Sequence, residues 1–438
     1  MKRLTLFASL LLGCLSSLCG QSEMNLIALK SVMQSDAYNP ALFREQGLHF
    51  GLPSGAYNFF HTGPALEDLV NNTTQGSSLD ISNLANELSG DNYLTSEFRF
   101  QTFKIKLNRP FWSIGFEQSI NFNSNVTYPD DLILLYKDGN QQFIGQTVMI
   151  GPRATIYSYN SYALTLSYQL RGLSIGIRPK LLMGNYYGNT PRSSASLTTS
   201  DDIYQLTLDT DFQFDNVGIL SFADGNLLNY QVGQLNQWRP FTKNPGGALD
   251  LGLDVRLSDR LNFAISGIDI GTIKWKDGIK SYVSNRIIEY DGATVEDIFM
   301  IDQLDINGAL DSLRSIFDVS ESSSEVSLSL PTRWFMMVGY AKDDAWNLAL
   351  TGQYIKSSPY PVAIALVTSA QVQKWWTLGA AFGYRFGRLN AGLHTVLSFR
   401  RWRGFLTIDN VSNGINPLSS KNYQMNLGLS LHFGTSTN

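Results

Sequence analysis

The stretch Tyr423-Gln-Met-Asn-Leu-Gly-Leu-Ser-Leu-His-Phe433 decides the fold class of this chain. Its odd-numbered positions are all apolar, and its even-numbered positions are polar or glycine. A period of two is typical of a β-strand that has one apolar face. The same alternation returns along most of the chain, with clear examples at 112–117, 173–178, 249–258, 376–386 and 389–400.

Strand length separates two all-β architectures. Many of the alternating segments continue for about ten residues or more, whereas strands of globular proteins usually have about 5–6. Strands of about 9–11 residues fit a transmembrane β-barrel whose apolar face contacts lipid. Trp112, Trp334, Trp346, Trp375 and Trp402 lie near strand starts, where an interfacial aromatic belt is expected. A secreted β-sandwich adhesin would also alternate, with its apolar face turned inward, and stays as an alternative.

The composition agrees with a barrel. Charged residues make up 16% of the 438 residues, against about 25% in a typical soluble domain, and aromatic residues make up 12%. Mean hydropathy is −0.09, and no apolar run reaches the roughly 18 residues that a spanning helix needs. The formal charge of −4 gives the chain no broad attraction to nucleic acid, so we expect no nucleic-acid partner.

The first twenty residues resemble an export signal. Lys2 and Arg3 precede an apolar run and then small residues, the order of a secretory signal peptide, so residues 1–20 are expected to be cleaved. Cleavage would remove both cysteines, Cys14 and Cys19, and would move the formal charge from −4 to −6 by loss of Lys2 and Arg3. The segment 11–14, Leu-Leu-Gly-Cys, also fits a lipoprotein attachment box, so the two kinds of processing stay open.

The turns predict an antiparallel barrel over residues 46–438. Short connections near 108–110, 171–172, 258–260, 342–344 and 401–403 alternate with long ones near 62–94, 125–152, 276–325 and 410–420. This asymmetry is typical of bacterial outer-membrane barrels, which have an even number of strands. Phe212 and Leu249 fall on strands that run the same way, which leaves the count odd. We therefore expect about fourteen strands, with twelve or sixteen as alternatives and the error within 215–246.

Two segments do not fit the barrel wall. Residues 21–45 precede the first strand, contain the triplet Asn39-Pro40-Ala41, and are expected to form a hatch or plug. Residues 276–325 are expected to form a long loop, with an amphipathic helix over 306–317 that lies either outside the cell or in the lumen.

If the apolar phase faces lipid, the opposite phase lines the lumen. We predict these lumen-lining residues: Arg178, Lys180, Asp250, Asp254, Arg256, Arg385, His394 and Arg400. Both signs of charge are present, so either they bias solute passage or they pair with one another and stiffen the wall.

No catalytic group, metal site or cofactor site is predicted. The segment 172–176 matches the G-x-S-x-G pattern, but it continues an alternating strand and cannot form the strand-to-helix elbow of a hydrolase. The four histidines, His49, His61, His394 and His432, are never four residues apart, which disfavours a helical metal site. There is no phosphate-binding loop and no dinucleotide-binding glycine pattern. We therefore expect a protein that is not an enzyme.

The order of several short motifs resembles an uncharacterised family of outer-membrane barrels from Bacteroidota, a domain of unknown function. The matching stretches are 36–41, 128–132, 138–140, 162–164, Gly176, 180–184, 269–271 with Ile273 and Trp275, 330–333 and 409–410. That family is similar in turn to fatty-acid-transporter-type barrels and to barrel subunits of the type IX secretion system. The triplet Asn39-Pro40-Ala41 is similar to part of the transporter hatch. The resemblance implies fourteen strands and the outer membrane, and it carries no substrate and no functional residues.

Three functions remain open. The first is a bacterial outer-membrane barrel, embedded in outer-membrane lipid, that passes or binds a small molecule, with hydrophobic ones among the candidates. The second is a scaffold barrel that holds secretion-machinery or cell-surface proteins. The third is the secreted sandwich adhesin.

Overall fold

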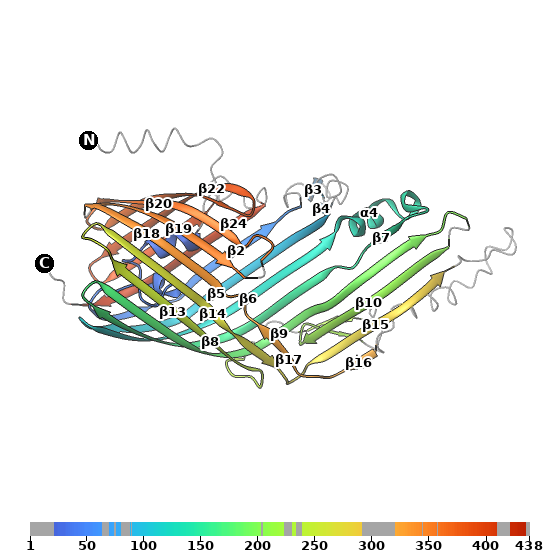
Figure 1. The fold of residues 1–438 in the computed structure, drawn as a ribbon, viewed down its shortest axis with the longest axis horizontal. Coiled ribbons are helices and arrows are strands. Elements are labelled where there is room, and N and C mark those ends of the chain that lie inside the picture. The colour runs from blue at the N-terminus through green and yellow to red at the C-terminus, as the bar shows by residue number, and fades with distance from the viewer. Residues whose placement is uncertain are drawn as a thin grey trace.

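A computed structural model shows that the chain closes into an antiparallel β-barrel of fourteen wall positions (Figure 1). The structure describes residues 22–63, 70–73, 76–79, 88, 90–202, 205–222, 230–233, 239–290, 320–343, 345–356, 358–409 and 421–434. The predicted signal peptide and the predicted helix at 306–317 lie outside these residues.

The wall is continuous because the last strand pairs with the first two. In order around the barrel it consists of β1 (Gly47–Gly51) with β2 (Ser54–His61), β5 (Asp91–Asn108), β6 (Trp112–Pro129), β8 (Arg153–Leu170), β9 (Leu173–Thr199), β13 (Pro245–Arg256), β14 (Leu261–Trp275), β18 (Arg333–Asp343), β19 (Trp346–Ile355), β20 (Val362–Gln373), β21 (Trp376–Arg385), β22 (Arg388–Phe399), β23 (Trp402–Asp409) and β24 (Asn422–Phe433). The closing pairs run from Leu48 opposite Phe433 to Phe60 opposite Asn422.

The alternation that predicted the strands has its apolar phase on the outside. In β24 the polar positions such as Gln424 and Asn426 are buried, while Leu427 and Phe433 are exposed. In β20 the exposed positions include Ile364 and Leu366. The sandwich alternative is therefore wrong, because its apolar face would be the buried one.

The odd strand count has a simple physical origin. β10 (Leu206–Val217) and β13 both pair antiparallel with β9. β10 pairs with residues 187–199 of that long strand, and β13 pairs with residues 173–183. The two strands run the same way because they occupy one wall position in succession. Residues 218–244 are inserted between them, and their described part includes β11 (Leu220–Phe222) and β12 (Tyr230–Val232). The strands that carry Phe212 and Leu249 do run in the same direction, and the described residues between them contain no return strand of the barrel wall.

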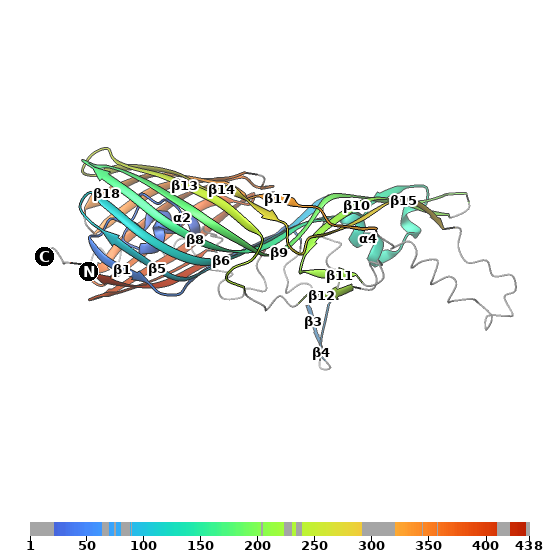
Figure 2. The ribbon, with the colours of Figure 1, turned by 90° about the horizontal axis from the view of Figure 1, so that it is seen from below.

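Several strands continue past the barrel as an open sheet. β15 (Lys280–Tyr290) pairs with β10, and β16 (Ser320–Ser322) pairs with β15. β17 (Val326–Ser329) joins β14, and β7 (Thr147–Met149) joins β9. Figure 2 shows this extension projecting from one side of the barrel, with α4 (Asp130–Asp138) beside it. Smaller elements are η3 (Gln141–Phe143), β3 (Val70–Thr73) and β4 (Gly76–Leu79).

The prediction of a loop over 276–325 is wrong for its described ends. Residues 280–290 form a strand that hydrogen-bonds along the full length of β10. The sequence hid this strand because polar residues face both sides of an open sheet, which weakens the alternation. The predicted loops at 62–94 and 125–152 are also too long, since β5 begins at Asp91 and β6 continues to Pro129.

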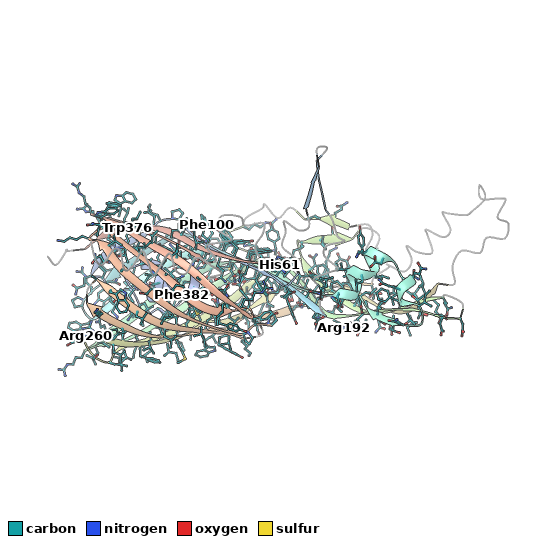
Figure 3. All side chains as sticks on the ribbon, turned by 90° about the horizontal axis from the view of Figure 1, so that it is seen from above. His61, Phe100, Arg192, Arg260, Trp376 and Phe382 are labelled. Atoms are coloured by element: carbon teal, nitrogen blue, oxygen red, sulfur yellow. The ribbon has the colours of Figure 1, made fainter. Side chains whose placement is uncertain are left out.

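The two ends of the barrel differ. At one end, tight turns join the strands, and residues such as Arg171, at φ 38°, and Arg400, at φ 52°, adopt left-handed conformations there. Trp112, Trp346 and Trp402 begin strands at this short-turn end. In Figure 3 Arg260 lies at the same end, whereas Arg192 lies on the extension. None of the described helices is long and apolar enough to cross a membrane.

Candidate functional site: a plugged lumen and its cavity

Residues 22–46, called the plug from here on, fill the interior of the barrel. They include α2 (Ser22–Ala28) and η1 (Met33–Ala37), and in Figure 2 the blue ribbon of α2 is seen behind the strands of the barrel wall. Met24, Ile27 and Met33 are completely buried. Apolar plug residues form one cluster with wall residues that point inward, among them Ala264, Ile268, Phe335, Ala365 and Val396. Small wall side chains leave the room that the plug occupies.

Asp36 is the electrostatic centre of the plug. Its carboxylate pairs with Lys104, lies 2.9 Å from the Lys106 ammonium and lies 3.8 Å from the Arg178 guanidinium. Arg178 also donates to the backbone carbonyls of Asp36, at 2.9 Å, and Ala37, at 2.6 Å. Burial alone would raise the pKa of Asp36, but Lys104, Lys106 and Arg178 hold that pKa below its ordinary 3.8. The carboxylate is therefore charged and fully desolvated between three cations.

The ion pairs continue around the wall and return to the plug. Arg178 contacts Asp250 at 2.7 Å, and Lys180 bridges Asp250, at 2.8 Å, and Asp269, at 2.6 Å. Arg333 then joins Asp269, at 2.6 Å, to Glu23 of α2, at 3.1 Å. Buried pairs of this kind need every member, because removal of one leaves an uncompensated charge.

At the short-turn end a second contact holds the plug. Asp254 pairs with Arg44 and lies 2.8 Å from the Lys30 ammonium. Burial, with the nearby charges of Arg44 and Arg256, lowers the pKa of Lys30 from 10.5 to about 7. Two cations thus contact one buried carboxylate at this mouth, and Arg256 lies close enough to both cations to act on them.

The triplet Asn39-Pro40-Ala41 seats against two glycines of the wall. The Asn39 amide donates to the carbonyls of Leu253, at 3.0 Å, and Ile265, at 3.3 Å. A Cβ atom added at Gly176 would lie 2.6 Å from the Ala41 nitrogen, and one added at Gly252 would lie 2.8 Å from Pro40 Cδ. The wall therefore needs glycine at both positions for the triplet to fit.

Six of the eight predicted lumen residues are buried in the interior. These are Arg178, Lys180, Asp250, Asp254, Arg385 and His394. Arg385 approaches Glu23 at 3.8 Å, and His394 contacts Ser369 at 2.9 Å and Asn25 of the plug at 3.1 Å. They pair with one another and with the plug.

The prediction is wrong for the other two. Arg400 lies exposed in the tight turn between β22 and β23, where the alternation has ended. Arg256 ends β13 and is exposed at the short-turn mouth, beside Lys30 and Arg44.

Sequence reasoning missed half of the charge network. Lys104, Lys106 and Glu117 on β5 and β6, with Asp269 and Arg333, belong to it. A signal was present, because Phe103, Ile105 and Leu107 alternate with the two lysines. The register shift between Gln101 and Phe103 interrupts that alternation and hides it.

Ser174 of the G-x-S-x-G pattern faces the plug. Its hydroxyl donates to the Ala41 carbonyl at 3.1 Å and is buried. His49 and His432 contact each other, with their Nδ1 atoms 2.9 Å apart. Within the described residues no group of three or more His, Cys, Asp or Glu side chains is arranged to hold a metal ion.

A cavity of about 620 Å³, including the open space at its mouth, lies beside the plug. Glu23 and Tyr38 form its plug side, and wall strands supply Glu97, Arg99, Tyr157, Tyr159, Asp269 and Arg333. On β5, Glu97 and Arg99 precede Lys104 and Lys106, so the cavity lies towards the extension. The rings of Tyr157 and Tyr159 are nearly parallel, with centroids 6.1 Å apart.

Together the fold and the interior define a plugged antiparallel β-barrel. The chain belongs to a family of unknown function (DUF5723), whose model matches residues 40–409. This agrees with the resemblance that the motif order indicated. A search of the curated proteins finds no match.

The chain is similar to several solved structures of distant sequence. The Ralstonia pickettii toluene transporter TbuX is 10% identical, with a TM-score of 0.44 over 91% of this chain and 93% of that one. A Pseudomonas aeruginosa FadL homologue is 11% identical, with a TM-score of 0.46 over 95% and 97%. The Pseudomonas putida toluene transporter TodX is 10% identical, with a TM-score of 0.40 over 91% and 92%. These comparisons concern the fold and add nothing about a ligand.

Proposed function

We propose that this protein is a bacterial outer-membrane barrel that binds a small molecule in its cavity and passes it through the lumen when the plug moves. The observation that carries the proposal is the plug itself, which occupies the lumen and forms one side of the cavity. A ligand in the cavity touches Glu23 and Tyr38, so binding and plug position are coupled through shared contacts.

The membrane location is supported by the outer surface of the barrel. Exposed apolar side chains such as Ile364, Leu366 and Phe399 face away from the lumen. A closed barrel satisfies every backbone group within the wall, which is the condition for crossing lipid with strands. Export by a cleaved signal peptide, residues 1–20, is part of the same proposal.

The cavity supports a ligand with an apolar body. Tyr38, Tyr157 and Tyr159 present aromatic surface, and Leu330 and Pro331 add aliphatic surface. Charged and amide groups share the lining, and a purely hydrocarbon ligand would take water away from Glu97, whose side chain has only one long hydrogen bond within the protein. The ligand class proposed is therefore a small molecule that joins an apolar body to a polar group.

The scaffold alternative is favoured by one observation. The sheet formed by β9, β10 and β15 extends beyond the barrel and exposes apolar side chains such as Ile287. A scaffold would present this surface to a protein partner while the plug stays in place.

A reversible lock of the plug separates the two functions. In the variant Asn39→Cys/Gly252→Cys, the two positions are in direct contact, and the sequence after Cys19 contains no other cysteine. In proteoliposomes, we expect the oxidised variant to exclude benzyltrimethylammonium and benzenesulfonate, two aromatic ions that cross lipid poorly. Reduction with dithiothreitol should restore entry of at least one, because the plug can then move.

The two single-cysteine variants provide the control, since dithiothreitol should leave their permeability unchanged. Gly252→Cys alone also shows how far the added Cβ opens the lumen, and entry into the reduced double variant must exceed that level. Equal entry before and after reduction, with the disulfide verified by mass spectrometry, would contradict a moving plug and favour the scaffold.

A further inference from the structure

We propose that the cavity selects cationic ligands that carry an ammonium group on an apolar body. The residues that recognise such a ligand are Glu97 and the tyrosines Tyr157, Tyr159 and Tyr38. The inference rests on the proposed function and names the ligand class of the same cavity. It is based on which of the charged groups that line the cavity already have an ion-pair partner within the protein and which do not.

Each arginine of the cavity is already neutralised. Arg99 pairs with Glu117, and Arg333 contacts both Asp269 at 2.6 Å and Glu23 at 3.1 Å. A ligand anion would have to compete with these carboxylates for guanidinium groups that they already hold. Among the described residues that line the cavity, no cation is therefore free for an acidic ligand.

The carboxylates differ from one another. Asp269 is held by Lys180 and Arg333, and Glu23 by Arg333 and the Gln353 amide. Among the residues that the structure describes, Glu97 has no cation within ion-pair distance, although Arg333 and Arg385 act on it electrostatically from farther away. Its one hydrogen bond is the long contact from the Asn58 amide, at 3.4 Å. It is also partly exposed, which for a side chain pointing inward means exposed to the cavity.

The groups around Glu97 suit a cation further. Tyr157 and Tyr159 present stacked ring faces on the β8 wall, and Tyr38 presents a third ring from the plug. Aromatic faces attract ammonium groups, most strongly where water is excluded. The amides of Asn121 and Asn123 complete this part of the lining without adding charge. A carboxylate facing several aromatic rings is a recognition site for an ammonium group with an apolar substituent.

The test compares aromatic ligands that differ in charge. Binding of benzyltrimethylammonium, benzyl alcohol and benzenesulfonate to the detergent-purified full chain is measured by titration calorimetry. We expect the cation to bind about tenfold or more tightly than the alcohol, and the sulfonate to bind most weakly. Glu97→Gln should remove the preference for the cation over the alcohol.

Two further variants distinguish charge from ring contact. Tyr157→Leu should weaken binding of the cation, whereas Tyr157→Phe, which keeps the ring, should not. Glu289→Gln changes the same charge on the exposed part of β15 and should alter nothing. Equal binding of all three ligands, tighter sulfonate binding, or a preference that survives Glu97→Gln would overturn the inference, as would absence of binding by all three.

These outcomes are separable from failure of the proposed function. A plug that moves on reduction of the cysteine lock, together with binding that ignores charge, would keep the proposed function and remove this inference. A plug that never moves, together with cation-selective binding, would contradict the proposed passage through the lumen and keep the inference about the ligand class.

Discussion

The substitution Gly176→Val is expected to displace the plug from its contact with the barrel wall. A Cβ at this position would lie 2.6 Å from the Ala41 backbone nitrogen, and backbone cannot turn aside as a flexible side chain can. Overpacking of this kind costs about 1–3 kcal/mol, which raises the population with a displaced plug by about fivefold to a hundredfold. Ion conductance of the protein in planar bilayers should rise by a similar factor.

The matched control is Gly247→Val. Gly247 also lies in the strand pair β9–β13, but a Cβ there meets only the Lys180 carbonyl, at 3.9 Å. Its conductance should equal that of the native chain. If the folded Gly176→Val variant conducts no more than the control, the contact of residues 39–41 with the wall does not hold the plug in place.

The substitution Asp36→Asn should have the largest effect on stability. It keeps the shape of the side chain but leaves Lys104, Lys106 and Arg178 buried with one anion fewer. Loss of one member of a buried ion-pair network costs about 3–5 kcal/mol. We expect earlier release of the plug on heating, detected as protease cleavage within residues 22–46 at temperatures where the native plug is protected.

A second substitution tests whether charge is the cause. Lys106→Met removes one of the stranded cations, so the double variant should recover part of the loss, which is a coupling that independent sites do not show. Asp138→Asn on exposed α4 is the control and should leave cleavage unchanged. Strictly additive effects of the two substitutions would contradict the electrostatic account.

The sequence predicted the architecture well because barrel strands obey a local rule. Tyr423 and its alternate neighbours lie on the outer face of the wall, and the alternation could be read without knowing any partner strand. The extension could not be predicted in this way. Residues 280–290 carry polar groups on both faces, and their pairing with β10 depends on a long insertion between β10 and β13.

The interior was predictable only in part. Alternation placed Arg178 and Asp250 in the lumen, but the register shift at Gln101 hid Lys104 and Lys106. Asp36 was not recognisable as the partner of all these cations, because its position depends on how the plug enters the barrel. The Glu97 cavity likewise depends on which charges find partners, and those pairs join residues far apart in the sequence.

The most direct test of the central claim, that residues 22–46 close the lumen of an outer-membrane barrel, is planar-bilayer conductance of the chain with and without them. Heat-modifiable migration of both forms, extracted from the outer-membrane fraction, first establishes that each barrel is folded. The account predicts at most rare, brief openings of the native protein and steady open channels after the deletion. Silence in both forms, or equal conductance in both, would contradict it.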